Sequence, residues 1–171
     1  MIEYRIGNSN QTLFFSPEVM AHFEKYRQSM PWHKEAGGQL FAKLDLPRIS
    51  VEIATGPRKT DKRTRTSYVA DRAAEQAEIA EYTRKGYQFI GDWHSHPQRE
   101  PEPSPRDIES MTETVSKSQH SLRGFVLVIV GTGLGFNGLF VSVCDRTSIH
   151  RLEPIFPAGR SNQSAKPLVW I

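Results

Sequence analysis

Helical spacing of apolar side chains predicts three helices. Apolar residues recur with the helical period over 16–28, where a serine and then a proline open the pattern. Two further helices are expected over 71–85 and 104–116. An aspartate begins the first of these segments and a serine begins the second, and both side chains cap helix N-termini.

Short apolar runs between these helices predict the strands. They fall at 38–46, 49–54, 88–94, 125–130 and 139–145, with a short one near Ile149. The run at 125–130 lacks polar residues, which is typical of a strand covered on both faces. Several strands follow one another after short turns. We therefore expect an α+β (mixed α/β) fold with a single curved mixed sheet flanked by helices.

Length and composition narrow the class of protein. The 171 residues suit one domain over 1–153, followed by a tail over 154–171 that is rich in Pro, Gly, Ser and Asn. Lys and Arg number 22 against 19 Asp and Glu, a mildly basic balance that permits an acidic partner. We expect no nucleic acid partner, because no base-stacking or DNA-reading motif is present, and no membrane span. A single cysteine, Cys144, suits the reducing cytoplasm.

One segment carries the candidate chemistry. His94 and His96 are two residues apart at a strand end, so both imidazoles leave the same face. Asp107 lies in the first turn of the helix that follows. Two His and one carboxylate leave the fourth position of a tetrahedral zinc site open to water, as catalytic sites do. Taken singly, the two histidines are interpreted as exposed side chains, and Ser104 and Asp107 as a helix cap. Their joint spacing favours a metal site.

This spacing resembles a known family. His94-x-His96, seven residues, then Ser104-x-x-Asp107 is the pattern of the JAMM metalloproteases, also called the JAB or catalytic MPN domain. That family has an upstream E-x-G-G-x-L segment, which is similar to 35–40 here, although Ala42 stands where glycine is frequent. The resemblance covers about 12–152 and implies the JAB/MPN (cytidine-deaminase-like) architecture.

The resemblance also implies roles for the site residues. His94, His96 and Asp107 would bind one Zn²⁺, and Glu35 would be the general base. Ser104 would direct its hydroxyl toward the oxyanion. Taken alone, Glu35 is equally a solvated surface charge. A non-catalytic MPN-type scaffold is the alternative, and it commonly lacks these ligands.

Within the family, the chain is similar to prokaryotic enzymes associated with ubiquitin-like conjugation in antiphage defence of the CBASS type. The resemblance implies an isopeptidase or peptidase that cleaves after the C-terminus of a conjugated protein. The substrate would be a CD-NTase conjugate or, alternatively, a bacterial ubiquitin-like modifier conjugate with an extended C-terminal tail. An E1/E2-like enzyme would make the bond that this protein breaks.

A basic segment over 56–67 is the last candidate. It contains five cationic residues, and such a loop is more often solvated than functional. Beside a peptide cleft it would bind acidic parts of the substrate protein, through Arg58, Lys59, Lys62, Arg63 and Arg65. The tail of the substrate is expected to bind by strand addition, because backbone hydrogen bonds hold a tail without strict sequence.

Overall fold

The fold, seen in a computed structural model that describes residues 2–118 and 122–156, is built on one nine-stranded sheet. Its strand order is β10-β9-β8-β7-β3-β4-β2-β1-β11. The bounds are β1 (Ile2–Arg5), β2 (Thr12–Phe15), β3 (Gly37–Asp45), β4 (Arg48–Ala54), β7 (Gln88–Ser95), β8 (Phe125–Val130), β9 (Leu139–Cys144), β10 (Ile149–Arg151) and β11 (Glu153–Pro154). A separate two-stranded sheet joins β5 (Lys62–Arg63) to β6 (Tyr68–Val69).

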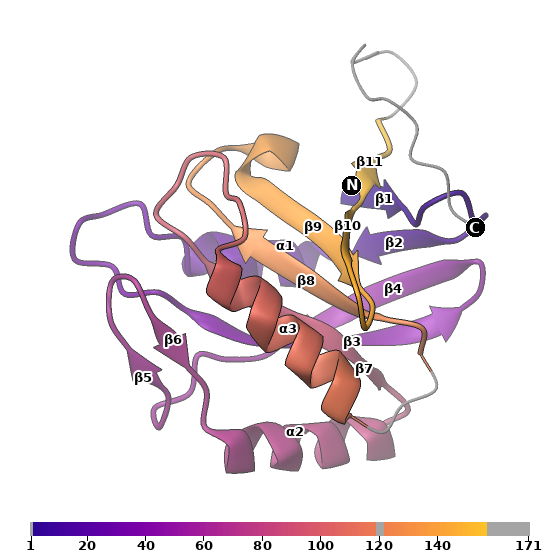
Figure 1. The fold of residues 1–171 in the computed structure, drawn as a ribbon, viewed down its shortest axis with the longest axis horizontal. Coiled ribbons are helices and arrows are strands. Elements are labelled where there is room, and N and C mark those ends of the chain that lie inside the picture. Colours follow the sequence, from indigo (N-terminus) through magenta and orange to yellow (C-terminus); the bar gives the residue numbers. More distant parts are fainter. Residues whose placement is uncertain (1, 119–121, 157–171) are drawn as a thin grey trace.

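The main sheet is mixed. The pairs β2–β4 and β7–β8 are parallel, and all other neighbouring pairs are antiparallel. The expected α+β fold with a single curved mixed sheet is confirmed (Figure 1). The expectation of a loop over the whole of 56–67 is wrong in its middle, because Lys62 and Arg63 form β5. Two-residue strands are too short to produce an alternating pattern.

Helices cover the two faces of the sheet. They are α1 (Pro17–Lys25), α2 (Arg72–Arg84) and α3 (Pro105–Lys117), and a 3-10 helix η1 (Gly135–Gly138) precedes β9. Figure 1 shows α3 across the front of the sheet and α1 behind it. Phe23 of α1 packs in one apolar cluster with Trp93, whereas Met111 and Val115 of α3 pack in a second cluster with Phe89.

The helix starts follow local chemistry. Ser16, Asp71 and Ser104 each accept backbone N–H groups at the N-cap of α1, α2 and α3. In α3 the cap is reciprocal, since Asp107 Oδ2 also accepts the N–H of Ser104 at 2.7 Å. The expected N-termini are confirmed, and α1 ends at Lys25, three residues before the expected end.

A bulge in β7 decides which side chains face which helix. Leu40 of β3 pairs with Gly91 and Phe41 pairs with Phe89, so Ile90 is an extra residue. Ile90 and Trp93, which are three residues apart, therefore both belong to the α1 cluster, whereas Phe89 belongs to the α3 cluster. Gly91 has a φ of +146°, and a Cβ there would lie 1.9 Å from the carbonyl oxygen of Val126. Only glycine fits at this position.

The sheet reaches slightly past the expected domain boundary. Pro154 pairs with Tyr4 in the β1–β11 ladder, so the first residue of the expected 154–171 tail is part of the sheet. Residues 157–171 of that tail lie outside the described residues. Each helix in the described ranges is too short or too polar to cross a bilayer.

Candidate active site

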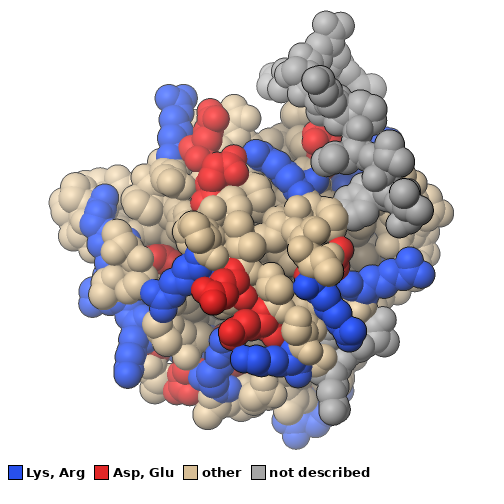
Figure 2. Space-filling model, viewed as in Figure 1, with Lys and Arg blue, Asp and Glu red and all other residues tan. Residues whose placement is uncertain are grey.

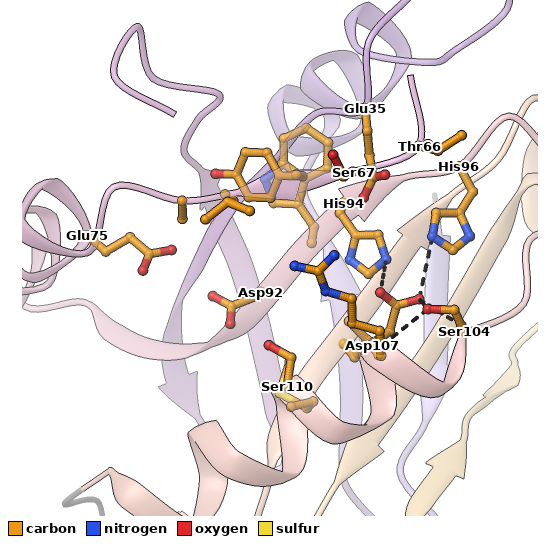
Figure 3. A pocket seen from close by; sticks show the side chains of 18 of the residues that line it. Glu35, Thr66, Ser67, Glu75, Asp92, His94, His96, Ser104, Asp107 and Ser110 are labelled. Carbon is orange, nitrogen blue, oxygen red and sulfur yellow. Dashed lines mark hydrogen bonds and ion pairs between the residues drawn. The ribbon is translucent and has the colours of Figure 1, made fainter. Parts of the chain in front are cut away.

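A cavity of about 420 Å³ lies between the β5–β6 hairpin, β7 and α3. The five residues singled out by the sequence pattern all line it: Glu35, His94, His96, Ser104 and Asp107 (Figure 3). Glu35 precedes β3. His94 lies near the end of β7 and His96 directly follows that strand. Ser104 caps α3 and Asp107 lies in its first turn. The β7–β3 ladder, in which Gly37 pairs with His94, brings the glutamate segment beside the histidines.

Two imidazoles and one carboxylate converge in this cavity. His94 Nε2 lies 3.3 Å from Asp107 Oδ1, and His96 Nε2 lies 3.5 Å from Asp107 Oδ2. His94 Nε2 is buried without a well-formed hydrogen bond among the described residues. Ligands about 2.0–2.1 Å from a tetrahedral ion stand about 3.3 Å apart, so the spacing and the unpartnered nitrogen fit a zinc ion.

Glu35 provides a second carboxylate close to His94 and His96. One oxygen of Glu35 and one nitrogen each of His94 and His96 lie within 4.8 Å of one another. The geometry therefore allows two donor sets, the histidines with Asp107 or the histidines with Glu35. Glu35 is 7% exposed, and burial raises the pKa of its carboxyl above the ordinary value while nearby His94 lowers it.

The other titratable groups respond to the same surroundings. Burial lowers the pKa of His96, which favours the neutral imidazole that binds metals. Burial would raise the pKa of Asp107, but nearby His94 and the hydrogen bonds from Ser104 hold it below its usual range. The Ser104 hydroxyl donates to Asp107 Oδ2 at 2.7 Å, so the serine orients this carboxylate as well as capping α3.

Asp92 is a cavity residue that the sequence reasoning missed. It lines the cavity two residues before His94, and burial raises the pKa of its carboxyl to about 7. The alternating spacing of residues 92, 94 and 96 would have placed it on the face of the histidines.

A buried polar bridge behind the site was also missed. Ser95, between the two histidines, accepts the N–H of Ala36 at 2.9 Å and donates to Gln28 Oε1 at 3.2 Å. Gln28 Nε2 in turn donates to the carbonyl of Arg65 at 2.8 Å. No local sequence signal marks these contacts, because the partners are far apart along the chain.

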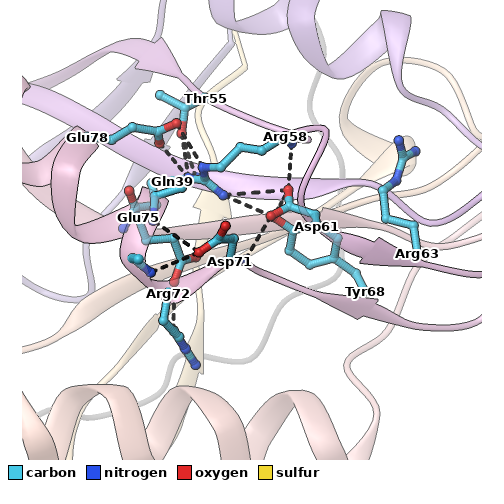
Figure 4. Close-up of polar contacts among 12 residues, drawn as sticks. Gln39, Thr55, Arg58, Asp61, Arg63, Tyr68, Asp71, Arg72, Glu75 and Glu78 are labelled. Carbon is cyan, nitrogen blue, oxygen red and sulfur yellow. Dashed lines mark hydrogen bonds and ion pairs between the residues drawn. The ribbon is translucent and has the colours of Figure 1, made fainter.

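The five cationic residues of the basic segment divide into two groups. Arg58 is held internally, with its Nε donating to Glu78 Oε1 at 2.8 Å, near Asp61 and Tyr68 (Figure 4). Lys59 and Lys62 are exposed.

The remaining two cations bond backbone carbonyls near the site. Arg63 Nε donates to the carbonyl of Glu35 at 2.6 Å, and Arg65 Nη1 donates to the carbonyl of Met30 at 3.1 Å. The guanidinium groups of this segment therefore have partners within the protein, and the two lysines point to solvent.

The mixed sheet and the cavity with its two histidines and nearby carboxylates are features by which a protein family can be recognised. We therefore compared the chain with models of known families. The family described as prokaryotic homologs of the JAB domain matches residues 19–143. The chain therefore belongs to this family, and the JAB architecture expected from the motif is confirmed.

Two curated proteins and one solved structure are similar to this chain. A protein of Pseudomonas aeruginosa (strain BWHPSA011 / Pa011) named CD-NTase/cGAS isopeptidase is 30% identical over 143 residues, covering 80% of this chain and 86% of that protein. One of the same name from Escherichia coli (strain TW11681) is 26% identical over 117 residues, covering 67% and 72%. A solved structure from Desulfitobacterium hafniense has a TM-score of 0.58 at 16% identity, covering 81% of this chain and 88% of that one, which supports the fold.

Proposed function

We propose that this protein is a zinc-dependent JAMM-type isopeptidase that removes a conjugated protein by hydrolysing the bond after its C-terminus. The observation that carries the proposal is the convergence of His94, His96 and Asp107 beside the buried carboxyl of Glu35. The names of the two curated relatives favour a CD-NTase conjugate as substrate. A bacterial ubiquitin-like modifier conjugate is the alternative.

We assign the metal to His94, His96 and Asp107. Asp107 contacts both imidazoles, and its low pKa keeps it ionised as a ligand. A zinc ion held there would polarise the scissile carbonyl and lower the pKa of a water molecule. Glu35 is then left for proton transfer.

The reaction follows from the placement of the two remaining residues. The Glu35 carboxylate accepts a proton from the attacking water and gives it to the leaving amine nitrogen, so that hydrolysis yields a free C-terminal carboxylate and an amine. The raised pKa of Glu35 suits a group that must both accept and release this proton. The Ser104 hydroxyl, whose single proton is donated to Asp107 Oδ2 in this structure, would rotate to donate to the oxyanion that develops on the carbonyl oxygen.

The cavity suits an extended tail. Residues 66–70, which include β6, line the same cavity as the histidines. A strand of a two-stranded sheet keeps one unpaired edge, which can bond the backbone of a substrate tail. Figure 2 shows acidic side chains gathered over α3 among Lys and Arg, so this face presents both signs of charge to a protein.

An isopeptide substrate implies a conjugation pathway in which this protein acts. Isopeptide conjugates require an enzyme that makes them, and an E1/E2-like conjugating enzyme is the functional partner we propose. The protein would act in the cytoplasm, reversing that conjugation or processing a precursor.

Metal content and cleavage test the proposal together. We expect the purified protein to hold one zinc per chain by elemental analysis and to release a CD-NTase from a conjugate. His94→Asn should lose both zinc and cleavage, whereas the matched control His150→Asn, outside the cavity, should keep both. A zinc content near zero after reconstitution would refute the metal assignment. Zinc without cleavage of either conjugate would favour the scaffold.

A further inference from the structure

The segment that carries Glu35 is held by consecutive residues of the β5–β6 hairpin. Arg63 Nε donates to the carbonyl of Glu35 at 2.6 Å, and Arg63 Nη2 donates to the carbonyl of Lys34 at 3.3 Å. The neighbouring Thr64 carbonyl accepts the N–H of Glu35 at 2.7 Å. Both backbone polar groups of Glu35 are therefore bound by residues about thirty positions later in the chain.

We propose that Arg63 is a positioning residue for Glu35, a role that rests on Glu35 being the base of the proposed reaction. The carboxylate of Glu35 can point at the cavity only if its backbone is fixed, because the residue lies in the connection before β3 and outside any regular element. The Arg63 guanidinium fixes that backbone at the carbonyl, and Thr64 fixes it at the amide.

Arginine is suited to this task by its shape. Its planar fork reaches two successive carbonyls from one side chain, and hydrogen bonds from a charged donor are the stronger kind. Lysine carries the same charge but has a single nitrogen at the end of a flexible stem. A charge-preserving replacement therefore separates positioning by the fork from simple attraction of an acidic substrate.

Arg65 of the same hairpin bonds residues that precede Glu35 in the chain. Arg65 Nη1 donates to the carbonyls of Met30 at 3.1 Å and Pro31 at 2.5 Å, and the Arg65 carbonyl accepts from Gln28. Arg63 is the member of this set whose side chain contacts Glu35 itself.

The kinetic test compares Arg63→Lys with Arg146→Lys, the same exchange at an exposed arginine between β9 and β10 that does not line the cavity. A misplaced catalytic group slows the reaction without weakening substrate binding. We expect Arg63→Lys to lower kcat about tenfold, the size of one lost hydrogen bond to a charged group, with KM, zinc content and melting temperature unchanged. Arg146→Lys should leave all four unchanged. A raised KM that recovers at high salt, with kcat unchanged, would overturn the proposal and make Arg63 a substrate contact.

Amide hydrogen exchange provides a readout that does not depend on cleavage. In Arg63→Lys the Glu35 amide should exchange several-fold faster than in the wild type, because the loosened segment opens more often. In Arg146→Lys it should exchange at the wild-type rate. Equal exchange in all three proteins would overturn the positioning role even if the enzyme is active. Faster exchange in a protein that cleaves nothing would support the positioning and leave the proposed function refuted.

Discussion

Ser95 provides the sharpest test of the structure, because its hydroxyl joins the histidine strand to the glutamate segment. Ser95→Ala removes the acceptor of the Ala36 N–H and the donor to Gln28 Oε1. Both partners stay buried, since Ala36 is 0% exposed and Gln28 is 2% exposed. A buried polar group that loses its partner costs about 1–3 kcal/mol, so the two losses should lower the free energy of unfolding by about 2–6 kcal/mol.

Ser142→Ala is the matched control. Ser142 is also 0% exposed and also lies in a strand of the sheet. Among residues 2–118 and 122–156, its hydroxyl makes only a long bond to the Leu127 carbonyl at 3.4 Å and a weak contact with the Cys144 sulfur at 3.8 Å. We expect its loss to cost about 1 kcal/mol or less.

Urea unfolding followed by circular dichroism measures both variants. A domain of this kind has about 5–15 kcal/mol of stability, so Ser95→Ala should still unfold in a measurable transition. The double variant Gln28→Met with Ser95→Ala should lose less stability than the sum of the single variants. Both groups of the Ser95–Gln28 hydrogen bond are then removed, so neither remains buried without its partner. Equal losses for Ser95→Ala and Ser142→Ala would refute the assignment of a specific polar bridge.

Three further predictions concern the site. Glu35→Gln should keep one zinc per chain by elemental analysis while cleavage slows about 10²–10⁴-fold, and loss of zinc would instead make Glu35 a ligand. Ser104→Ala should lower kcat about 10²–10³-fold and stability by about 1 kcal/mol, and a change in unfolding alone would leave only the helix cap. Lys59→Gln combined with Lys62→Gln should raise KM with kcat unchanged, an effect that weakens in salt; wild-type KM at low salt would show that these lysines bind no substrate.

Local signals predicted much of the fold. The capping residues fixed the helix starts, and the apolar run of β8 matched its predicted bounds of 125–130. Five strands, β1, β2, β5, β6 and β11, were not predicted, because two to four residues are too few to establish a period. Their positions depend on partners distant in the chain, such as β4 for β2.

In the candidate site, too, local patterns predicted some features, whereas contacts between distant segments were missed. Motif spacing selected the five residues that the fold brings to one cavity, while their roles remain proposals. The groups that hold them were not predictable. Arg63 was expected to bind substrate, and the sequence did not indicate that its side chain also reaches a carbonyl 28 positions earlier. Such contacts follow from how the hairpin packs on the connection before β3, which no pattern within either segment specifies.

The bulge in β7 means that residue spacing alone does not give the faces of this strand. Phe89 and Trp93 are four residues apart, so strict alternation would place both side chains on one face, yet they pack in opposite clusters. A strand of the same length without the bulge would turn the indole of Trp93 toward α3 and the imidazoles of His94 and His96 toward α1. Deleting one residue at the bulge would instead restore strict alternation and leave all three side chains on their present faces. A sequence alignment that places a one-residue gap within 89–92 is therefore compatible with the same site.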